Sequence, residues 1–222
     1  MSTKNSHHQI YLIDDHPLMR AGMAKVIEME DDLKICGEFG QGKGALDVVR
    51  KATPDVIILD ISLKDSSGLE LIKDFRAVGL NTPILVVSTH DEALYAERIL
   101  KAGANGYLMK EEATDRLIGA IRCVLQGGIF LSDQMNTVML KRFAGTRGVD
   151  SSEATLQRLT DREFEVFEMI GKGLPPRVIA GNLGISPKTV DAHRCNIKEK
   201  LAIKDGSELI RYAVSWIESA GV

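Results

Sequence analysis

The sequence predicts an α/β domain built on a doubly wound, five-stranded parallel sheet, followed by a small all-α domain. Short apolar runs rich in β-branched residues alternate five times with helical patterns in the first 130 residues, as in parallel strands that are covered on both faces. No strand pattern occurs after residue 156. With 222 residues, 44% of them apolar, the chain is long enough for two domains that each bury a core.

The five strands are predicted where the chain is apolar over four to six residues. Three runs are clear and two are weaker, and in chain order the five are residues 10–13, 33–38, 56–59, 84–87 and 106–109. Helical patterns follow each of them, at residues 18–29, 43–51, 69–77, 92–102 and 113–126. This alternation implies right-handed crossovers, with a ligand crevice at the carboxyl ends of the strands.

Two segments separate this domain from the rest of the chain. Residues 131–143 have apolar side chains at helical spacing behind Ser132, a suitable N-cap, and predict a connecting helix. Residues 145–155 are small and polar without periodicity, so we expect a mobile linker there. The predicted division is therefore 8–130, 131–155 and 156–222.

Polar side chains stand at the predicted carboxyl ends of the strands. Asp14 and Asp15 follow the first strand and Asp60 follows the third. Because neighbouring strands lie only about 5 Å apart, these carboxylates can converge, and their crowding favours a cation. Oxygen ligands with no obvious set of cysteine or histidine residues alongside favour Mg²⁺. Asp60 is then the natural nucleophile, with Lys110 to neutralise a phosphoryl group and Ser88 to hydrogen-bond it.

Each of these residues also has an ordinary interpretation. A single Asp at a strand end is most often a helix cap or a solvated loop residue, and a single Lys or Ser there is even less informative. The functional interpretation rests on finding all of them at successive strand ends. His16, beside the acidic pair, is expected to be a surface loop residue and not a ligand.

Residues 8–127 resemble a two-component receiver domain, which has a flavodoxin-like sheet. The matching segments are LIDDHP, IILDISLKDSSG, LVVSTHD and AGANGYLMK. The resemblance implies that Asp60 accepts a phosphoryl group from a sensor histidine kinase. It also implies a Mg²⁺ site formed by Asp14, Asp15, Asp60 and the backbone carbonyl of Ser62. The family's hydroxyl and lysine fall on Ser88 and Lys110.

The same resemblance places the family's switch aromatic on Tyr107. The alternative for Tyr107 is a half-buried core ring whose hydroxyl lies at the surface. One departure from the family is visible, because Lys64 stands where a proline is frequent in the loop after the phosphoacceptor. We expect this departure to affect the stiffness of the loop more than its chemistry.

The C-terminal segment has the helix start and stop signals of a helix-turn-helix. Thr160 and Glu163 form a capping box pattern, and Pro175-Pro176 marks a second helix start. Gly184 suits a sharp turn, and Ser186-Pro187 caps and starts the next helix. Residues 172–204 carry seven Lys or Arg against two Asp or Glu, whereas residues 1–130 carry 15 against 19. A polyanion should therefore prefer the C-terminal part.

The helix predicted at residues 187–201 has one apolar stripe, Val190, Ile197 and Leu201. Its remaining polar side chains face outward, which alone is usually a solvated face. With the turn pattern and the local positive charge they indicate contact with DNA bases and phosphates in the major groove. The candidate contact residues are Lys188, Thr189, Asp191, His193, Arg194, Asn196 and Lys198.

Residues 156–205 resemble the LuxR-type effector domain, whose third helix reads the major groove. The matching segments are LTDREFEVFEMIGKG and IAGNLGISPKTVDAHRCNIKEKL. Pro175-Pro176 replaces a small residue and Asn, and Asp191 stands where lysine is frequent. Asp191 either accepts a hydrogen bond from a cytosine amino group or repels a phosphate, so no target sequence follows. Cys195 is expected to be a packing residue or a neutral contact and not a redox sensor.

The two resemblances follow one another as in LuxR-type (NarL/FixJ class) response regulators. They imply a transcription regulator in which phosphate on Asp60, acting through Ser88 and Tyr107, promotes homodimerisation and binding of double-stranded DNA. Apart from self-catalysed phosphorylation and dephosphorylation of Asp60, no enzymatic activity is expected. The three cysteines are widely spaced and no apolar stretch is long enough to span a membrane, so we expect a soluble cytoplasmic protein with reduced thiols.

Two other functions fit parts of the sequence. An aspartyl-phosphate hydrolase would use Asp60 as its nucleophile but would want an acid/base Asp two residues later, where Ser62 stands. A constitutive DNA-binding protein could use the first domain only for docking. A docking surface, however, has no physical need for three crowded carboxylates.

Overall fold

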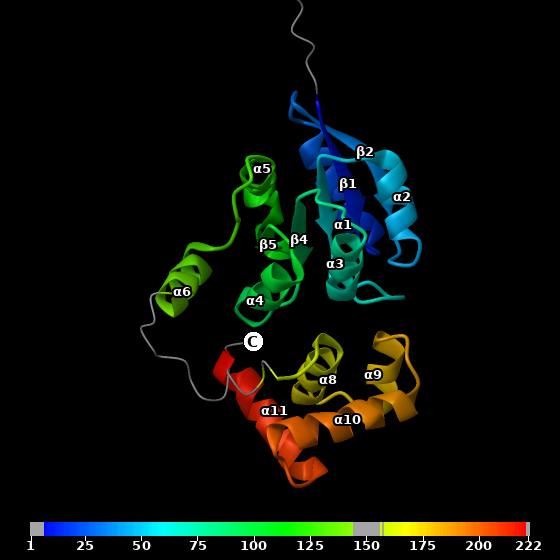
Figure 1. Ribbon diagram of the computed structural model, residues 1–222, viewed down its shortest axis with the longest axis vertical. Coiled ribbons are helices and arrows are strands. Elements are labelled where there is room, and N and C mark those ends of the chain that lie inside the picture. The colour runs from blue at the N-terminus through cyan, green and yellow to red at the C-terminus, as the bar shows by residue number, and fades with distance from the viewer. Residues whose placement is uncertain (1–6, 144–155, 157, 221–222) are drawn as a thin grey trace, which may run out of the picture. The chain divides into compact units, whose positions relative to one another are not determined.

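The computed structural model describes residues 7–143, 156 and 158–220 (Figure 1). The chain divides into two compact units, Met1–Asn136 and Thr137–Val222. The predicted linker, residues 145–155, lies outside the described residues. The predicted domain boundaries stay a prediction.

The first unit contains the predicted five-stranded parallel sheet, with strand order β2-β1-β3-β4-β5. The chain moves outward from β1 to β2 and then continues on the other side of β1 with β3, which makes the β1/β3 boundary the switch point where ligands bind in such sheets. Ile13 pairs with Leu59 in the register of β1 and β3. The strands are β1 (His8–Ile13), β2 (Leu33–Phe39), β3 (Val56–Leu59), β4 (Ile84–Ser88) and β5 (Gly106–Met109).

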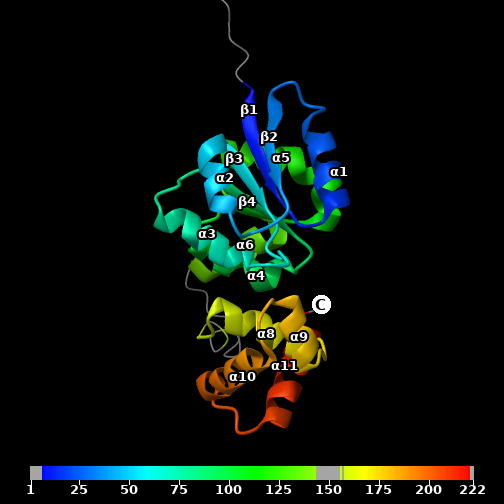
Figure 2. The ribbon, with the colours of Figure 1, turned by 90° about the vertical axis from the view of Figure 1, so that its right-hand side faces the viewer.

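Helices cover both faces of this sheet (Figure 2): α1 and α5 lie on one face, and α2, α3 and α4 lie on the other. The central strands β3 and β4 are buried at every residue. Burial on both faces explains why they are almost entirely apolar. The helices are α1 (Pro17–Ile27), α2 (Ala45–Ala52), α3 (Gly68–Ala77), α4 (Glu92–Ala102) and α5 (Ala113–Leu125), with a short 3-10 helix, η1 (Lys110–Glu112), before α5.

The connecting helix α6 (Asp133–Phe143) is present as predicted. The Ser132 hydroxyl oxygen accepts a hydrogen bond from the backbone N–H of Met135 at 3.1 Å, so Ser132 is its N-cap. The prediction of this cap is confirmed.

The second unit is all-helical in its described residues. α10 packs against α8 and α9, and α11 packs against α8. The rings of Phe164 and Phe167 on α8 each lie 5.5 Å from that of Trp216 on α11. The bounds are α8 (Asp161–Gly171), α9 (Pro176–Asn182), α10 (Pro187–Leu201) and α11 (Gly206–Ala220).

The predicted helix caps and the glycine turn of the helix-turn-helix are confirmed. Thr160 and Glu163 form the capping box at the start of α8. Gly184 has φ of 62° between α9 and α10, a left-handed conformation that glycine adopts without steric cost. The Ser186 hydroxyl accepts a hydrogen bond from the backbone N–H of Thr189 and caps α10.

Two remaining predictions concern the cysteines and membrane segments. Cys36, Cys123 and Cys195 are all free thiols, and Cys195 is exposed. Among the described residues, no helix combines the length and apolarity that crossing a membrane requires.

Candidate functional site

The three predicted carboxylates meet at the switch point of the sheet. Asp14 follows β1 and Asp60 follows β3, and the pairing of Ile13 with Leu59 sets them side by side. Asp14 and Asp60 are each 1% exposed and Asp15 is 8% exposed. Carboxylates buried this deeply need a cation or hydrogen-bond donors close by.

Lys110 supplies a buried cation to this cluster. Its Nζ lies 2.6 Å from Oδ2 of Asp60 and 2.8 Å from Oδ2 of Asp14. Burial by itself would lower the pKa of Lys110, but the nearby carboxylates of Asp60 and Asp14 outweigh burial and raise the pKa. Lys110 therefore stays protonated and holds the two carboxylates together. The other Asp60 oxygen, Oδ1, accepts a hydrogen bond from the Ser62 backbone N–H at 3.0 Å.

Lys64 has a direct part in this cluster. Its backbone N–H donates to Oδ2 of Asp15 at 3.2 Å, and its Nζ lies 3.5 Å from the same oxygen. A proline at this position has no N–H to donate. Lys64 thus gives Asp15 a donor and a second positive charge. Our expectation that the departure to lysine affects loop stiffness more than chemistry stays a prediction.

His16 and Arg20 also contact the cluster, although neither was predicted to take part in it. His16 is exposed, as expected for a surface loop residue, yet its Nδ1 lies 2.9 Å from Oδ1 of Asp15 and 3.6 Å from Oδ2 of Asp60. Arg20 on α1 donates to the backbone carbonyl of Asp14 at 2.6 Å and pairs with Glu38 on β2. Their position just after the acidic pair in the sequence was the available signal.

Ser88 and Tyr107 are linked through one loop. Ser88 is fully buried, and its hydroxyl oxygen accepts a hydrogen bond from the His90 backbone N–H at 3.2 Å. The Tyr107 ring is also fully buried, and its hydroxyl donates to the His90 backbone carbonyl at 2.6 Å. The alternative of a half-buried Tyr107 with its hydroxyl at the surface is therefore wrong.

The cluster has the donor set of a divalent cation site. Asp14, Asp15, His16 and Asp60 offer ligand atoms that all lie within 4.8 Å of one another. The buried Oδ1 of Asp15 accepts no hydrogen bond, and the His16 ring faces it. Hard carboxylate oxygens are the ligands that Mg²⁺ prefers. These residues therefore fit that ion.

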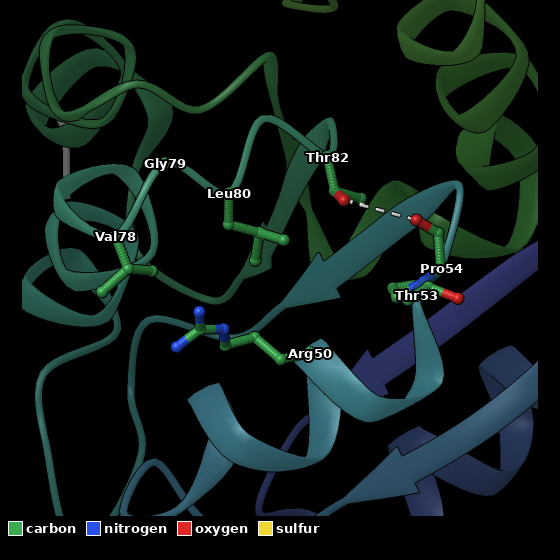
Figure 3. Close-up of a pocket in the computed structure, with 7 residues that line it drawn as sticks. All are labelled: Arg50, Thr53, Pro54, Val78, Gly79, Leu80 and Thr82. Carbon is green, nitrogen blue, oxygen red and sulfur yellow. Dashed lines mark hydrogen bonds between the residues drawn. The ribbon is translucent and has the colours of Figure 1, made fainter.

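A cavity of about 350 Å³ lies at the amino ends of β3 and β4, away from the acidic cluster at their carboxyl ends (Figure 3). Its lining comes from the end of α2 and the segment before β3, together with the α3–β4 connection. Thr82 donates to the Pro54 carbonyl at 3.3 Å across its rim, and Arg50 is its one charged lining residue. None of the predicted site residues lines this cavity.

The predicted DNA-contact residues all lie on α10. Val190 and Ile197 are buried, which turns the opposite side of the helix to solvent, whereas Leu201 is half-buried. Of the candidates, Lys188, Thr189, Asp191 and Asn196 are exposed, and His193, Arg194 and Lys198 are half-buried.

Contacts within the second unit constrain some of these side chains. Asp191 lies 3.8 Å from Arg194, so its charge is partly offset on the helix itself. The Thr189 hydroxyl lies 2.8 Å from the Ser186 hydroxyl within the cap. At the other end of α10, Lys200 pairs with the buried Glu163 of α8 at 2.6 Å. This pair links the end of α10 to the start of α8.

Two family models match the chain. One is described as "Response regulator receiver domain" and matches residues 10–122. The other is described as "Bacterial regulatory proteins, luxR family" and matches residues 157–213. The acidic cluster lies within the first match and the helix-turn-helix within the second.

Curated relatives match over nearly the whole length. The transcriptional regulatory protein UhpA of Escherichia coli is 38% identical over 202 residues, which cover 91% of this chain and 95% of UhpA. A nitrate/nitrite response regulator protein homolog of Haemophilus influenzae is 36% identical, over 88% of this chain and 90% of the relative.

A solved structure extends this likeness. It is RcsB from Salmonella enterica serovar Typhimurium, bound to promoter P1flhDC in the presence of phosphomimetic BeF3-. The TM-score is 0.64 at 25% identity, with 95% of this chain and 100% of the RcsB chain covered.

Proposed function

Because the chain belongs to the response regulators that join a receiver domain to a LuxR-type DNA-binding domain, we propose that phosphorylation of Asp60 controls its binding to DNA. The chain is a two-component transcription regulator and not an enzyme of metabolism. The observation that carries the proposal is the buried cluster in which Lys110 joins Asp60 to Asp14.

The phosphoryl transfer needs little covalent chemistry from the protein. A carboxylate oxygen of Asp60 attacks the phosphorus of a phosphohistidine on a sensor histidine kinase. The new P–O bond forms as the P–N bond breaks, and the leaving imidazole takes a proton from solvent. Lys110, held protonated by Asp60 and Asp14, offsets the negative charge of the transferred group.

Asp14, Asp15, Asp60 and the Ser62 carbonyl would hold Mg²⁺. The ion, when bound, supplies positive charge to the phosphoryl oxygens. Arg20 fixes the backbone of Asp14, and the Lys64 N–H orients Asp15. Ser88, at the end of the adjacent strand β4, would donate its hydroxyl hydrogen to a phosphoryl oxygen.

The DNA partner follows from the second unit. The exposed polar face of α10 suits the major groove, and its capped N-terminus favours a phosphate. The RcsB structure is bound to a promoter in the presence of a phosphomimetic, which supports the same coupling here. A phosphorylation-dependent homodimer would place two copies of α10 on half-sites about one helical turn apart.

The alternative of an aspartyl-phosphate hydrolase is not favoured. The position two residues after Asp60 carries Ser62, whose buried hydroxyl oxygen has no hydrogen-bond partner. A hydroxyl cannot serve as the acid and base that turnover of a phosphoester would require at neutral pH.

The proposal is tested by intact-mass analysis after incubation with Mg²⁺ and acetyl phosphate, followed by size-exclusion chromatography. We expect a single phosphoryl adduct on the wild type that requires Mg²⁺, is absent from Asp60→Asn, and shifts the protein towards the dimer. Asp55→Asn, which alters an exposed carboxylate before β3, is the matched control and should take up phosphate normally. An adduct that persists in Asp60→Asn would contradict the assignment.

A further inference from the structure

The chain that leads into α6 is attached to the strand that carries Tyr107. The backbone N–H of Tyr107 donates to the Phe130 carbonyl at 2.8 Å, and the Phe130 N–H donates to the Asn105 carbonyl at 3.0 Å. Phe130 thereby adds a one-residue bridge to the free edge of β5. The segment that begins the connection to the second unit is thus held by the backbone of the predicted switch residue.

Glu92 holds the next part of the same segment. It is the first residue of α4, and its side chain is 9% exposed. Its Oε1 accepts a hydrogen bond from the backbone N–H of Ser132 at 2.8 Å. Ser132 in turn caps α6, and its neighbours Leu131 and Met135 are buried. A nearly buried carboxylate bonded to a backbone N–H is a strong and directional anchor.

The loop from Ser88 to Glu92 is bound at both ends. Ser88 accepts from the His90 N–H, and His90 accepts from the Tyr107 hydroxyl. Asp91 caps α4 by accepting from the Ala93 N–H at 2.7 Å. A change in the side-chain rotamer of Ser88 therefore removes one of the two hydrogen bonds that hold the His90 backbone and loosens the loop that leads to Glu92.

We propose that Glu92 is the positioning residue through which phosphorylation at Asp60 reaches the connecting helix α6. This inference rests on the proposed function. When the Ser88 hydroxyl turns to a phosphoryl oxygen on Asp60, the hydrogen bond to the His90 N–H breaks. The start of α4 then shifts, the Glu92 to Ser132 hydrogen bond is lost, and the start of α6 becomes free to move. Without phosphate, the same bond holds the connection in one arrangement.

Hydrogen exchange of the full-length chain tests this relay, with mass spectrometry of peptides covering residues 129–140. In the wild type, phosphorylation with acetyl phosphate and Mg²⁺ should speed exchange in these peptides about tenfold, as expected for loss of a hydrogen bond to a charged acceptor. In Glu92→Ala the exchange should already be fast without phosphate, and phosphate should add nothing. Glu92→Gln, which keeps an acceptor oxygen, should restore part of the response.

Two substitutions at Ser132 separate the relay from the stability of α6. Ser132→Ala removes the capping hydroxyl but keeps the N–H, and should leave the phosphate response intact. Ser132→Pro removes the N–H and should behave like Glu92→Ala, which keeps the test available if Glu92→Ala does not fold.

The intact mass of every sample distinguishes a failure of the proposed function from a failure of the relay through Glu92. A wild type that takes up no phosphate would refute the proposed function and the relay with it. The relay alone would be refuted by a different result. In that result the wild type is phosphorylated and its exchange speeds up, while Glu92→Ala exchanges slowly without phosphate and speeds up by the same factor with it.

Discussion

The Nζ of Lys110 lies 2.6 Å from Oδ2 of Asp60, although the two residues are 50 positions apart and both are nearly buried. Asp60 follows β3 and Lys110 follows β5, so the pair spans β4 across the carboxyl ends of the strands. The contact places a fixed positive charge at the group that we propose as the phosphoacceptor.

Removing that charge should destabilise the first unit. Lys110→Ala leaves Asp14 and Asp60 buried together without their cation, and we expect a loss of about 3–5 kcal/mol in the free energy of unfolding. Mg²⁺ should restore more stability to this variant than it adds to the wild type. Calorimetric unfolding measures both effects, and Lys101→Ala, which breaks the exposed pair with Glu97, should cost less than about 1 kcal/mol. Equal losses for the two variants would refute the role of Lys110.

The raised pKa of Lys110 also predicts a dependence on pH. Its folded-state pKa lies above the unfolded value of about 10.4, so its stabilisation is fully present below that pH. The stabilisation is lost only as the pH rises through the folded-state value. The difference in unfolding free energy between wild type and Lys110→Ala should therefore stay constant through neutral pH.

Lys64 should weaken the binding of Mg²⁺. Its ammonium lies 3.5 Å from Asp15 and competes with the ion for that carboxylate. Lys64→Gln keeps the backbone N–H and removes the charge, so we expect an affinity up to about fivefold higher, the most that an exposed ion pair contributes. Titration calorimetry with Mg²⁺ measures this, and Lys51→Gln on the exposed side of α2 controls for net charge. An unchanged or weaker affinity would show that the ammonium does not compete.

The pair of Glu163 and Lys200 should make the second unit sensitive to acid. Burial by itself raises the pKa of Glu163, but the Lys200 ammonium and the Thr160 N–H outweigh burial and lower it. The stabilisation is therefore present above the unfolded pKa of about 4.3 and is lost as the pH falls through the folded-state value. Relative to Glu163→Gln, the wild type should lose its advantage only below about pH 4.

The fluorescence of the single tryptophan, Trp216, reports unfolding of this unit selectively, because its ring packs on Phe164 and Phe167. At neutral pH, Glu163→Gln should cost about 1–2 kcal/mol. A difference between the two proteins that did not vary with pH would exclude the ion pair as its cause.

Lys188 should contact a DNA phosphate through the exposed start of α10. Lys188→Ala should weaken binding to any duplex and reduce the slope of log affinity against log salt by about 0.9, the value for one phosphate contact. Fluorescence anisotropy over a salt series measures the slope. Lys51→Ala removes the same charge from the other compact unit and should leave the slope unchanged. A Lys188→Ala slope equal to that of the wild type would place Lys188 outside the interface.

Much of this structure could be predicted because its signals are local. The continuous apolar runs of β3 and β4 indicate burial on both faces of the sheet. The capping residues Thr160 and Ser186 mark the starts of two helices. The convergence of Asp14, Asp60 and Lys110 followed from the geometry of parallel sheets alone.

The contacts that were not predicted are made by backbone groups or by isolated residues that belong to no periodic pattern. The bridge of Phe130 to β5 involves one residue, too few for any periodicity. Almost every residue has a backbone N–H. The sequence therefore cannot indicate that the N–H of Lys64 binds Asp15 or that the N–H of Ser132 binds Glu92. The buried Tyr107 was ambiguous because its ring suits a core or a surface equally well.

The central claim is that phosphate on Asp60 controls DNA binding, and one measurement tests it most directly. A duplex is first selected from a random-sequence library by the wild-type chain. Its affinity is then measured with and without acetyl phosphate for the wild type and Asp60→Asn. We predict that phosphorylation tightens binding by the wild type about tenfold or more and leaves Asp60→Asn unchanged. Equal affinity of the phosphorylated and unphosphorylated wild type, with the adduct verified by intact mass, would contradict the account.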